Sequence, residues 1–139
     1  MRLIGLDLGD ATIGVAVSDL LGFTAQGVTT IRRTAFKQDM AELKKIVAEY
    51  GGEAFVLGLP LNLNGTRGPA VDKVESFADM LKKEFGLPVY FQDERLTTVA
   101  AHKMLLDNDT SRKKRRQVVD KLAAVLILQT YLDTPNTPK

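Results

Sequence analysis

Asp7 is the first residue whose type and position indicate chemistry; it lies in the segment GLDLGDATIG, near the end of the first apolar run. An ionised carboxylate at the end of a buried strand is costly unless a partner compensates its charge. The flanking Gly5 and Gly9 have no side chains, so a phosphate or a metal ion has room to approach. A turn-capping role is the alternative, but Asp10 and Asp19 are better placed for it. We therefore expect Asp7 to bind a cation or ligand.

A second acidic position is the pair Asp93 and Glu94 in the segment QDERLTT, where a predicted strand ends and a predicted helix begins. In parallel α/β sheets, ligands bind beyond the carboxyl ends of the strands, so this position favours a functional role. Strand side chains alternate between two faces, so only one of the pair need face a site, while the other caps the helix or holds Arg95. A purely structural capping acid is the alternative.

Asp120 is the third candidate, in the segment VVDKLAAVLIL. Helical geometry puts Ala124 and Ile127 on the same face as this carboxylate, which places it on an apolar stripe. A carboxylate on the core-facing side of a helix is expected to be paired, protonated or bound to a cation. The alternative is a salt bridge to Arg116 or Lys121.

Three separated carboxylates of this kind fit the chemistry of a hard divalent cation. Mg²⁺ and Mn²⁺ take oxygen ligands and leave room for the oxygens of a substrate phosphate. Two such ions about 4 Å apart activate water and stabilise the leaving oxygen of an in-line displacement. The chain has no cysteine, and His102 is its one histidine, so a thiolate or histidine-rich site is not expected. We therefore predict hydrolysis of a phosphodiester, with Mg²⁺ or Mn²⁺ as cofactor.

The segment GLPLNLNGTRGP, residues 58–69, follows a predicted buried strand and carries polar side chains on a glycine-rich backbone. Asn62, Asn64 and Arg67 are the donors that we expect to contact a phosphate backbone. The segment lacks the GK[ST] ending of a nucleotide-binding P-loop, so ATP binding of that type is not expected. A purely structural turn is the alternative for each residue taken alone.

A basic run stands just ahead of Asp120 and consists of Arg112, Lys113, Lys114, Arg115 and Arg116. The net charge of the chain is +2, but without this run 14 Lys and Arg would stand against 17 Asp and Glu, a balance of −3. Positive charge is therefore concentrated at one place, where it can steer a polyanion. A solvated helix start is the alternative, and the nearness of Asp120 favours contact with nucleic acid.

The elements that must position these residues alternate between strand and helix patterns. Strands are expected at residues 2–8, 13–18, 23–31, 54–59 and 88–92, and helices at residues 40–50, 71–86, 97–106 and 110–132. The first three strands can pair antiparallel, while helical crossovers place the last two parallel to the first. The expected fold is an α/β mixed five-stranded sheet flanked by helices. We expect one domain over residues 1–134 and a frayed tail over residues 135–139.

Composition limits the class of protein. A chain of 139 residues with 45% hydrophobic content suits one core. No run approaches the roughly 18 apolar residues of a membrane span, and the chain enters strand-like sequence without a signal peptide. Together with the absence of cysteine, these features lead us to expect a cytoplasmic protein.

Four segments in this order and spacing resemble the YqgF/RuvX family, over nearly the whole chain: GLDLGDATIGVAVSD, GLPLNLNGTRGP, DERLTT and SRKKRRQVVDKLAAVLILQTYL. The resemblance implies an RNase H-like fold and a nuclease that acts in maturation of the 5′ end of pre-16S ribosomal RNA. An older proposal for the family is Holliday junction resolution, because its fold resembles that of the RuvC resolvase. Carried over by position, the family's acidic metal site is Asp7, Glu94 and Asp120.

The partners that follow from this interpretation are nucleic acid and a ribosomal precursor particle. Structured RNA is favoured over branched DNA, and Arg95 is expected to join the loop and the basic run in contacting it. We expect no membrane partner and a monomer or weak homodimer. Two alternative functions remain. One is a non-catalytic nucleic-acid-binding module, and the other is an actin-like ATPase, which the short chain disfavours.

Overall fold

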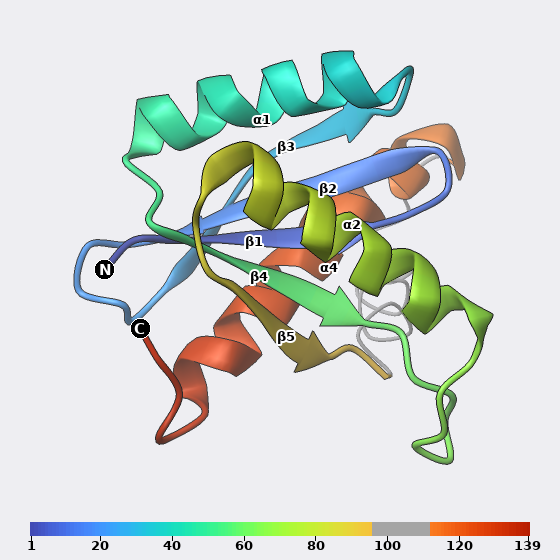
Figure 1. Cartoon of the computed structure of the whole chain (residues 1–139). Helices are drawn as coiled ribbons and strands as arrows, with labels where there is room; N and C mark the ends of the chain where they lie inside the picture. Colours follow the sequence, from blue (N-terminus) through green and yellow to red (C-terminus); the bar gives the residue numbers. More distant parts are fainter. Residues whose placement is uncertain (96–111) are drawn as a thin grey trace.

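The computed structural model describes residues 1–95 and 112–139, and the side chains of these residues other than 112–120 (Figure 1). The strands are β1 (Leu3–Leu8), β2 (Thr12–Ser18), β3 (Ala25–Arg32), β4 (Ala54–Leu59) and β5 (Val89–Asp93). The helices are α1 (Phe36–Tyr50), α2 (Pro69–Phe85) and α4 (Arg112–Asp133). The helix predicted over residues 97–106 lies outside the described residues.

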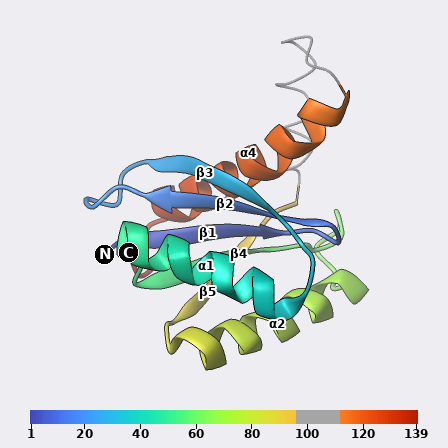
Figure 2. The ribbon, with the colours of Figure 1, turned by 90° about the horizontal axis from the view of Figure 1, so that it is seen from above.

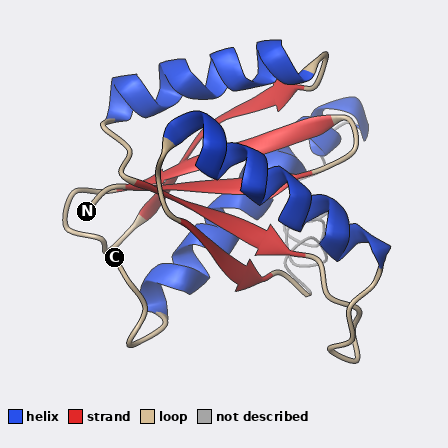
Figure 3. Cartoon of the chain, in the orientation of Figure 1, coloured by secondary structure: helices blue, strands red, loops and turns tan. Residues whose placement is uncertain are grey.

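The five strands form one sheet in the order β3-β2-β1-β4-β5. β2 pairs antiparallel with both β1 and β3, whereas β4 pairs parallel with both β1 and β5. The prediction of three antiparallel strands followed by two parallel ones is therefore confirmed. This order places the carboxyl ends of β1, β4 and β5 next to one another at one edge of the sheet (Figure 3).

Helices cover both faces of the sheet, α1 and α2 on one and α4 on the other (Figure 2). On the first face, Ile4 and Leu6 of β1 pack with the core that includes Leu43 and Phe77. On the second, Leu3 packs with a separate cluster. This division follows from the alternation of side chains along β1.

α4 lies unusually close to the sheet because glycines line its path. A Cβ atom added at Gly5 would lie 2.8 Å from Leu128 Cβ and 3.2 Å from Ala124 O. A Cβ at Gly27 would lie 2.9 Å from Lys121 Cγ. The alternation that turns Leu3 and Gly5 toward α4 also turns Asp7 toward it. The sequence thus builds a close helix-sheet contact that leads to the acidic end of β1.

α1 and α2 begin earlier than predicted, at Phe36 and at Pro69. Proline suits the first turn of a helix, because the amide that it lacks would have no intrahelical partner there. Both helices end at glycines in the left-handed conformation, Gly51 with φ 65° and Gly86 with φ 64°, as the sequence suggested.

Over the described residues, no helix has the length and apolar character needed to cross a membrane.

Candidate active site

Asp7 and Glu94 come together at the carboxyl edge of the sheet. Asp7 is the fifth residue of β1, opposite Gly14 of β2, and Glu94 follows the last residue of β5. β4 separates these two strands in the sheet. Even so, the side chain of Glu94 is hydrogen-bonded to that of Asp7. Two carboxylates far apart in the sequence therefore face one another.

A glycine in β4 makes this contact possible. A Cβ atom at Gly58 would lie 2.6 Å from Glu94 Oε2 and 2.6 Å from Ile127 Cδ1 of α4. The Glu94 carboxylate therefore occupies the space over the β4 backbone that any other residue at 58 would fill. Gly58 was not among the site residues predicted from the sequence, although a glycine inside an apolar strand often marks a close approach.

The electrostatics of the pair are unfavourable to two negative charges. The pKa of Glu94 is raised to about 8, first by burial, then by the charge of Asp7 and the hydrogen bond with it, and then by the charge of Asp93. A hydrogen bond between two carboxyl groups needs one proton, so protonated Glu94 donates to Asp7. Among the described residues, Glu94 Oε2 is buried without a hydrogen-bond partner. The site thus holds a buried oxygen that a cation would satisfy.

Asp93 is not a member of this pair and instead binds Arg95. Its Oδ1 accepts a hydrogen bond from the Arg95 backbone N–H at 2.9 Å, and its Oδ2 accepts one from Arg95 Nε at 2.8 Å. Residues 90, 92 and 94 share one side of the chain by alternation, and Tyr90 packs in the cluster under α4. Glu94 is therefore the acid that faces Asp7, while Asp93 holds Arg95.

Asp120 lies in α4, one turn before Ala124, which is fully buried against the sheet. The basic residues 112–116 form the first turns of the same helix. The side chains of Asp120 and of the basic run lie outside those that the structure describes. Within the described side chains, no group of three Asp, Glu, His or Cys residues is placed to hold a metal ion. A metal site on Asp7 and Glu94 would therefore need a further ligand.

The loop after β4 uses its predicted donors internally. Asn62 Nδ2 donates to Thr66 Oγ1 at 3.0 Å, and Asn64 Oδ1 accepts hydrogen bonds from the Thr66 N–H at 3.0 Å and hydroxyl at 2.6 Å. Arg67 forms an ion pair with Glu75 of α2. These contacts give Asn62, Asn64 and Arg67 a structural role in shaping the loop. Contact with a phosphate backbone would require Arg67 to leave Glu75.

Arg95 connects this loop to the acidic site. Its Nη1 donates to Leu63 O at 3.3 Å, while its Nε donates to Asp93. A cleft of about 500 Å³ opens here, lined among the described residues by Leu63, Gln92, Asp93 and Arg95. The loop, the end of β5 and the Glu94 carboxylate therefore share one rim of the molecule.

Arg33 is a residue near the site that the sequence did not single out. Its Nη1 donates to Gly9 O at 2.6 Å, in the turn that follows Asp7. Its guanidinium also lies 5.9 Å from the ring centroid of Phe77 and 3.9 Å from Asp39 Oδ2. Arg33 thus ties the turn after β1 to both helices of the opposite face. No spacing pattern signals such a contact, because it joins four elements.

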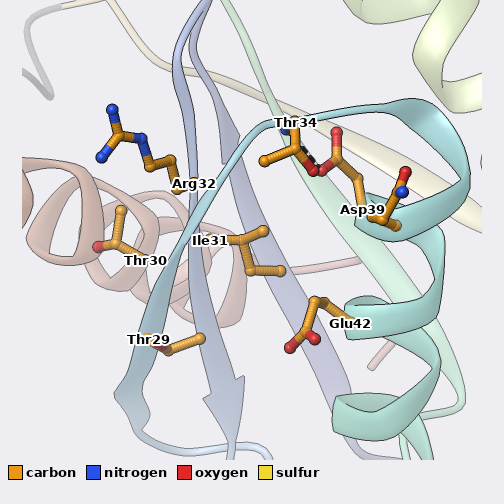
Figure 4. Close-up of a pocket in the computed structure, with 8 residues that line it drawn as sticks. Thr29, Thr30, Ile31, Arg32, Thr34, Asp39 and Glu42 are labelled. Carbon is orange, nitrogen blue, oxygen red and sulfur yellow. Dashed lines mark hydrogen bonds between the residues drawn. The ribbon is translucent and has the colours of Figure 1, made fainter.

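A second hollow, of about 340 Å³, lies between β3 and α1 (Figure 4). Its buried carboxylate, Asp39, accepts a hydrogen bond from the Thr34 N–H at 3.2 Å (Figure 4). The second oxygen of this carboxylate, Oδ2, lies 3.9 Å from Arg33 Nε. Asp39 therefore holds the chain where it enters α1. This role is structural, and it accounts for one of the two buried polar side chains among the described residues, the other being Ser18.

Comparison with known proteins agrees with the geometry. A family model described as RuvX, Holliday junction resolvase, matches residues 1–134. A protein of Clostridium novyi named "Putative pre-16S rRNA nuclease" is 57% identical over 134 residues, which cover 96% of this chain and 99% of that protein. A Moorella thermoacetica protein of the same name is 59% identical over 133 residues, 96% of this chain and 95% of that one.

Two solved structures share the fold at low identity. RuvC of Thermus thermophilus, in complex with a Holliday junction substrate, has a TM-score of 0.58 at 14% identity, over 94% of this chain and 92% of that one. The fowlpox virus Holliday junction resolvase has a TM-score of 0.55 at 13% identity, over 96% of this chain and 99% of that one. The fold is therefore the RNase H-like fold of RuvC-type resolvases. With its motifs in the family's order and its residues 1–134 matched by the family model, this chain belongs to the RuvX family.

Proposed function

We propose that this protein is a metal-dependent nuclease that cuts a phosphodiester in the 5′ region of pre-16S ribosomal RNA. The observation that carries the proposal is the meeting of Asp7 and Glu94 over Gly58, at the edge of the sheet where α/β proteins place their ligands. The names of relatives at 54–59% identity supply the substrate class. RNA in a ribosomal precursor particle is the expected form of that substrate.

Mg²⁺ or Mn²⁺ is the cofactor that the site would take. The donors are carboxylate oxygens, which suit hard cations, and the buried Glu94 Oε2 needs a positive partner. Asp7, Glu94 and Asp120 would hold the ion, since Asp120 lies in the helix that crosses this face. When bound, the cation supplies Lewis-acid stabilisation of the phosphate oxygens and makes the attacking water easier to deprotonate.

The chain's own residues would prepare the reaction in four ways. Glu94 and Asp7 share a proton, which leaves when a cation replaces it. Gly58 keeps the space over β4 free, so the carboxylates stay next to one another. Arg33 holds the turn at Gly9 and thereby fixes the end of β1 that carries Asp7. The basic residues 112–116 would bind the nucleic-acid backbone beside the site.

Cleavage of a labelled pre-16S 5′ leader with Mg²⁺ or Mn²⁺ tests the proposal. We expect cutting by the native protein, and a loss of at least a hundredfold in Asp7→Asn and in Glu94→Gln, because both substitutions remove a ligand charge. Folding of each variant is checked by circular dichroism. Salt-sensitive RNA binding by the native protein without cutting at any metal concentration would show a binding module instead.

Resolution of four-way DNA junctions is the second candidate, favoured by the family description and the shared fold. The carboxylate site does not distinguish ribose from deoxyribose, so a competition experiment is needed. A junction and the RNA leader are offered together at equal concentration. Preferential cutting of the junction, in two symmetric strands, would reverse the assignment and would call for a dimer in place of a monomer or weak homodimer.

A further inference from the structure

The cleft beside the acidic site is lined by an apolar side chain, an amide and an ion pair. Leu63 is 75% exposed at the tip of the loop after β4. Arg95 supplies a flat cation, and Gln92 supplies an amide. The volume of about 500 Å³ lies in the range of small-molecule sites. Side chains of these kinds can pack against, stack on and hydrogen-bond a planar heterocycle.

The guanidinium of Arg95 is held in a fixed plane. Asp93 accepts hydrogen bonds from its Nε at 2.8 Å and from its backbone N–H at 2.9 Å, while Leu63 O accepts one from Nη1 at 3.3 Å. Contacts from both sides orient the group before any ligand arrives. A planar cation held in this way presents its face for stacking on an aromatic ring.

The charge balance of the cleft disfavours a phosphate. Asp93 neutralises Arg95 across a 2.8 Å contact and lines the same hollow, so a phosphate there would approach a carboxylate. A nucleobase carries no such charge. Its ring stacks on Arg95, its apolar part meets Leu63, and its edge meets the Gln92 amide, whose Nε2 otherwise donates a weak bond to Asp93 O at 3.3 Å.

We propose that Leu63, Gln92 and Arg95 form a subsite for one unstacked nucleobase of the substrate strand, next to the phosphate that reaches Asp7 and Glu94. The inference rests on the proposed function, since the strand must pass the acidic pair to present its neighbouring base. It adds a specificity: the enzyme takes a nucleotide from a single-stranded or open region, because a base inside a duplex is not free to enter the cleft.

A binding experiment tests the subsite without any cleavage. Single-stranded RNA oligomers carry one fluorescent 2-aminopurine at successive positions, and binding is measured in EDTA. We expect one position whose emission is strongly quenched on binding. The quenching disappears in Leu63→Ala and in Arg95→Lys, and Leu63→Ala binds roughly tenfold more weakly, as expected for the loss of an apolar contact with the base. Arg95→Lys keeps the charge, so it separates the flat stacking face from simple attraction.

Leu21→Ala is the matched control, because Leu21 is 77% exposed in the turn after β2, at the opposite end of the sheet. It should bind and quench as the native protein does. Equal quenching in native protein, Leu63→Ala and Arg95→Lys would overturn the subsite.

A separate cleavage experiment uses RNA with one abasic nucleotide beside the cut. Loss of cutting at one abasic position supports the subsite, whereas equal cutting at all positions refutes it while leaving the nuclease intact.

Discussion

Glu94 is the residue whose environment has the clearest consequence for pH. Its pKa is about 8 in the folded chain and close to 4.5 when unfolded. Between these values the folded state holds a proton that the unfolded state has released, so the free energy of unfolding falls as pH rises from about 4.5 to 8. Below that window the contribution is complete, and above it the contribution is lost. The metal-free protein is therefore least stable where its metal affinity is highest.

We expect Glu94→Gln to remove this pH dependence, because a glutamine amide donates to Asp7 at every pH. The measurement is the urea midpoint in EDTA at pH 5, 6.5 and 8. The native protein should lose stability across the series, and the difference from Glu94→Gln should shrink toward the acid end. Glu53→Gln, at an exposed position before β4, is the control. A parallel slope in native protein and Glu94→Gln would contradict the assigned proton.

A single added Cβ atom at Gly58 is expected to reduce nuclease activity more than it reduces stability. In Gly58→Ala the new methyl meets the ends of two flexible side chains, Glu94 and Ile127, which can shift. We expect a stability loss at the low end of the roughly 1–3 kcal/mol of overpacking, with nuclease activity reduced more than tenfold by the displaced carboxylate. The comparison is Gly5→Ala, whose methyl meets Leu128 Cβ and the Ala124 carbonyl.

Gly5→Ala should cost more stability than Gly58→Ala and disturb the acidic pair less, because a backbone carbonyl cannot move without moving α4. Thermal unfolding and cleavage rate, measured on the same samples, decide the matter. If both variants lose stability and activity in the same proportion, Gly58 has no separate role in seating Glu94.

At the scale of elements, α4 is fastened to the start of β3 by one side chain. Gln129 Oε1 accepts the Ala25 N–H at 2.9 Å, and its Nε2 donates to Phe23 O at 2.9 Å. Truncation in Gln129→Ala leaves the part-buried Ala25 amide without that acceptor, which costs about 1–3 kcal/mol. We expect faster hydrogen exchange at Ala25 and a lower midpoint. Gln38→Ala, on the exposed side of α1, should change neither.

The described elements were largely predictable, since the five strands and the helices α1, α2 and α4 follow from apolar periodicity. The errors lie at the ends. α1 begins at Phe36 and not near Met40, because its first turn is held by Asp39, which bonds the chain before the helix, and not by an apolar stripe. β3 begins at Ala25 and carries a register shift opposite Val15 and Ala16, which composition does not encode.

The candidate site was predictable in part. Asp7 stood out because an acid at the end of an apolar strand needs compensation. The choice between Asp93 and Glu94 depended on which face of β5 meets α4, and one strand pattern leaves that open. Gly58 and Arg33 escaped notice because their contacts join elements far apart in sequence. The proposed roles of Asp120 and of the basic run remain predictions, because their side chains lie outside those that the structure describes.

At the scale of the whole molecule, charge is expected to control encounter with RNA. The five basic residues at the start of α4 reverse an otherwise acidic balance. Replacing Lys113 and Lys114 by Gln should weaken RNA binding and flatten the dependence of log K on log salt by roughly one to two. Fluorescence anisotropy at 50 to 200 mM salt measures the slope.

The matched control for that pair is Lys44→Gln with Lys45→Gln on α1, which covers the other face of the sheet. The net charge changes by the same amount in both double variants. If the dependence of log K on log salt flattens equally in the two double variants, total charge, and not the basic run, drives binding.

The position of α4 also has a consequence for synthesis. This helix follows every other described element in the chain, and among the described helices it is the one that covers the sheet face formed by Leu3, Ala16, Ala54 and Val56. A nascent chain still lacking α4 leaves that apolar face without the residues of α4 that pack on it. The protein therefore completes its second hydrophobic layer only when α4 has left the ribosome. If Asp120 completes the proposed metal site, that site forms in the same step as this layer.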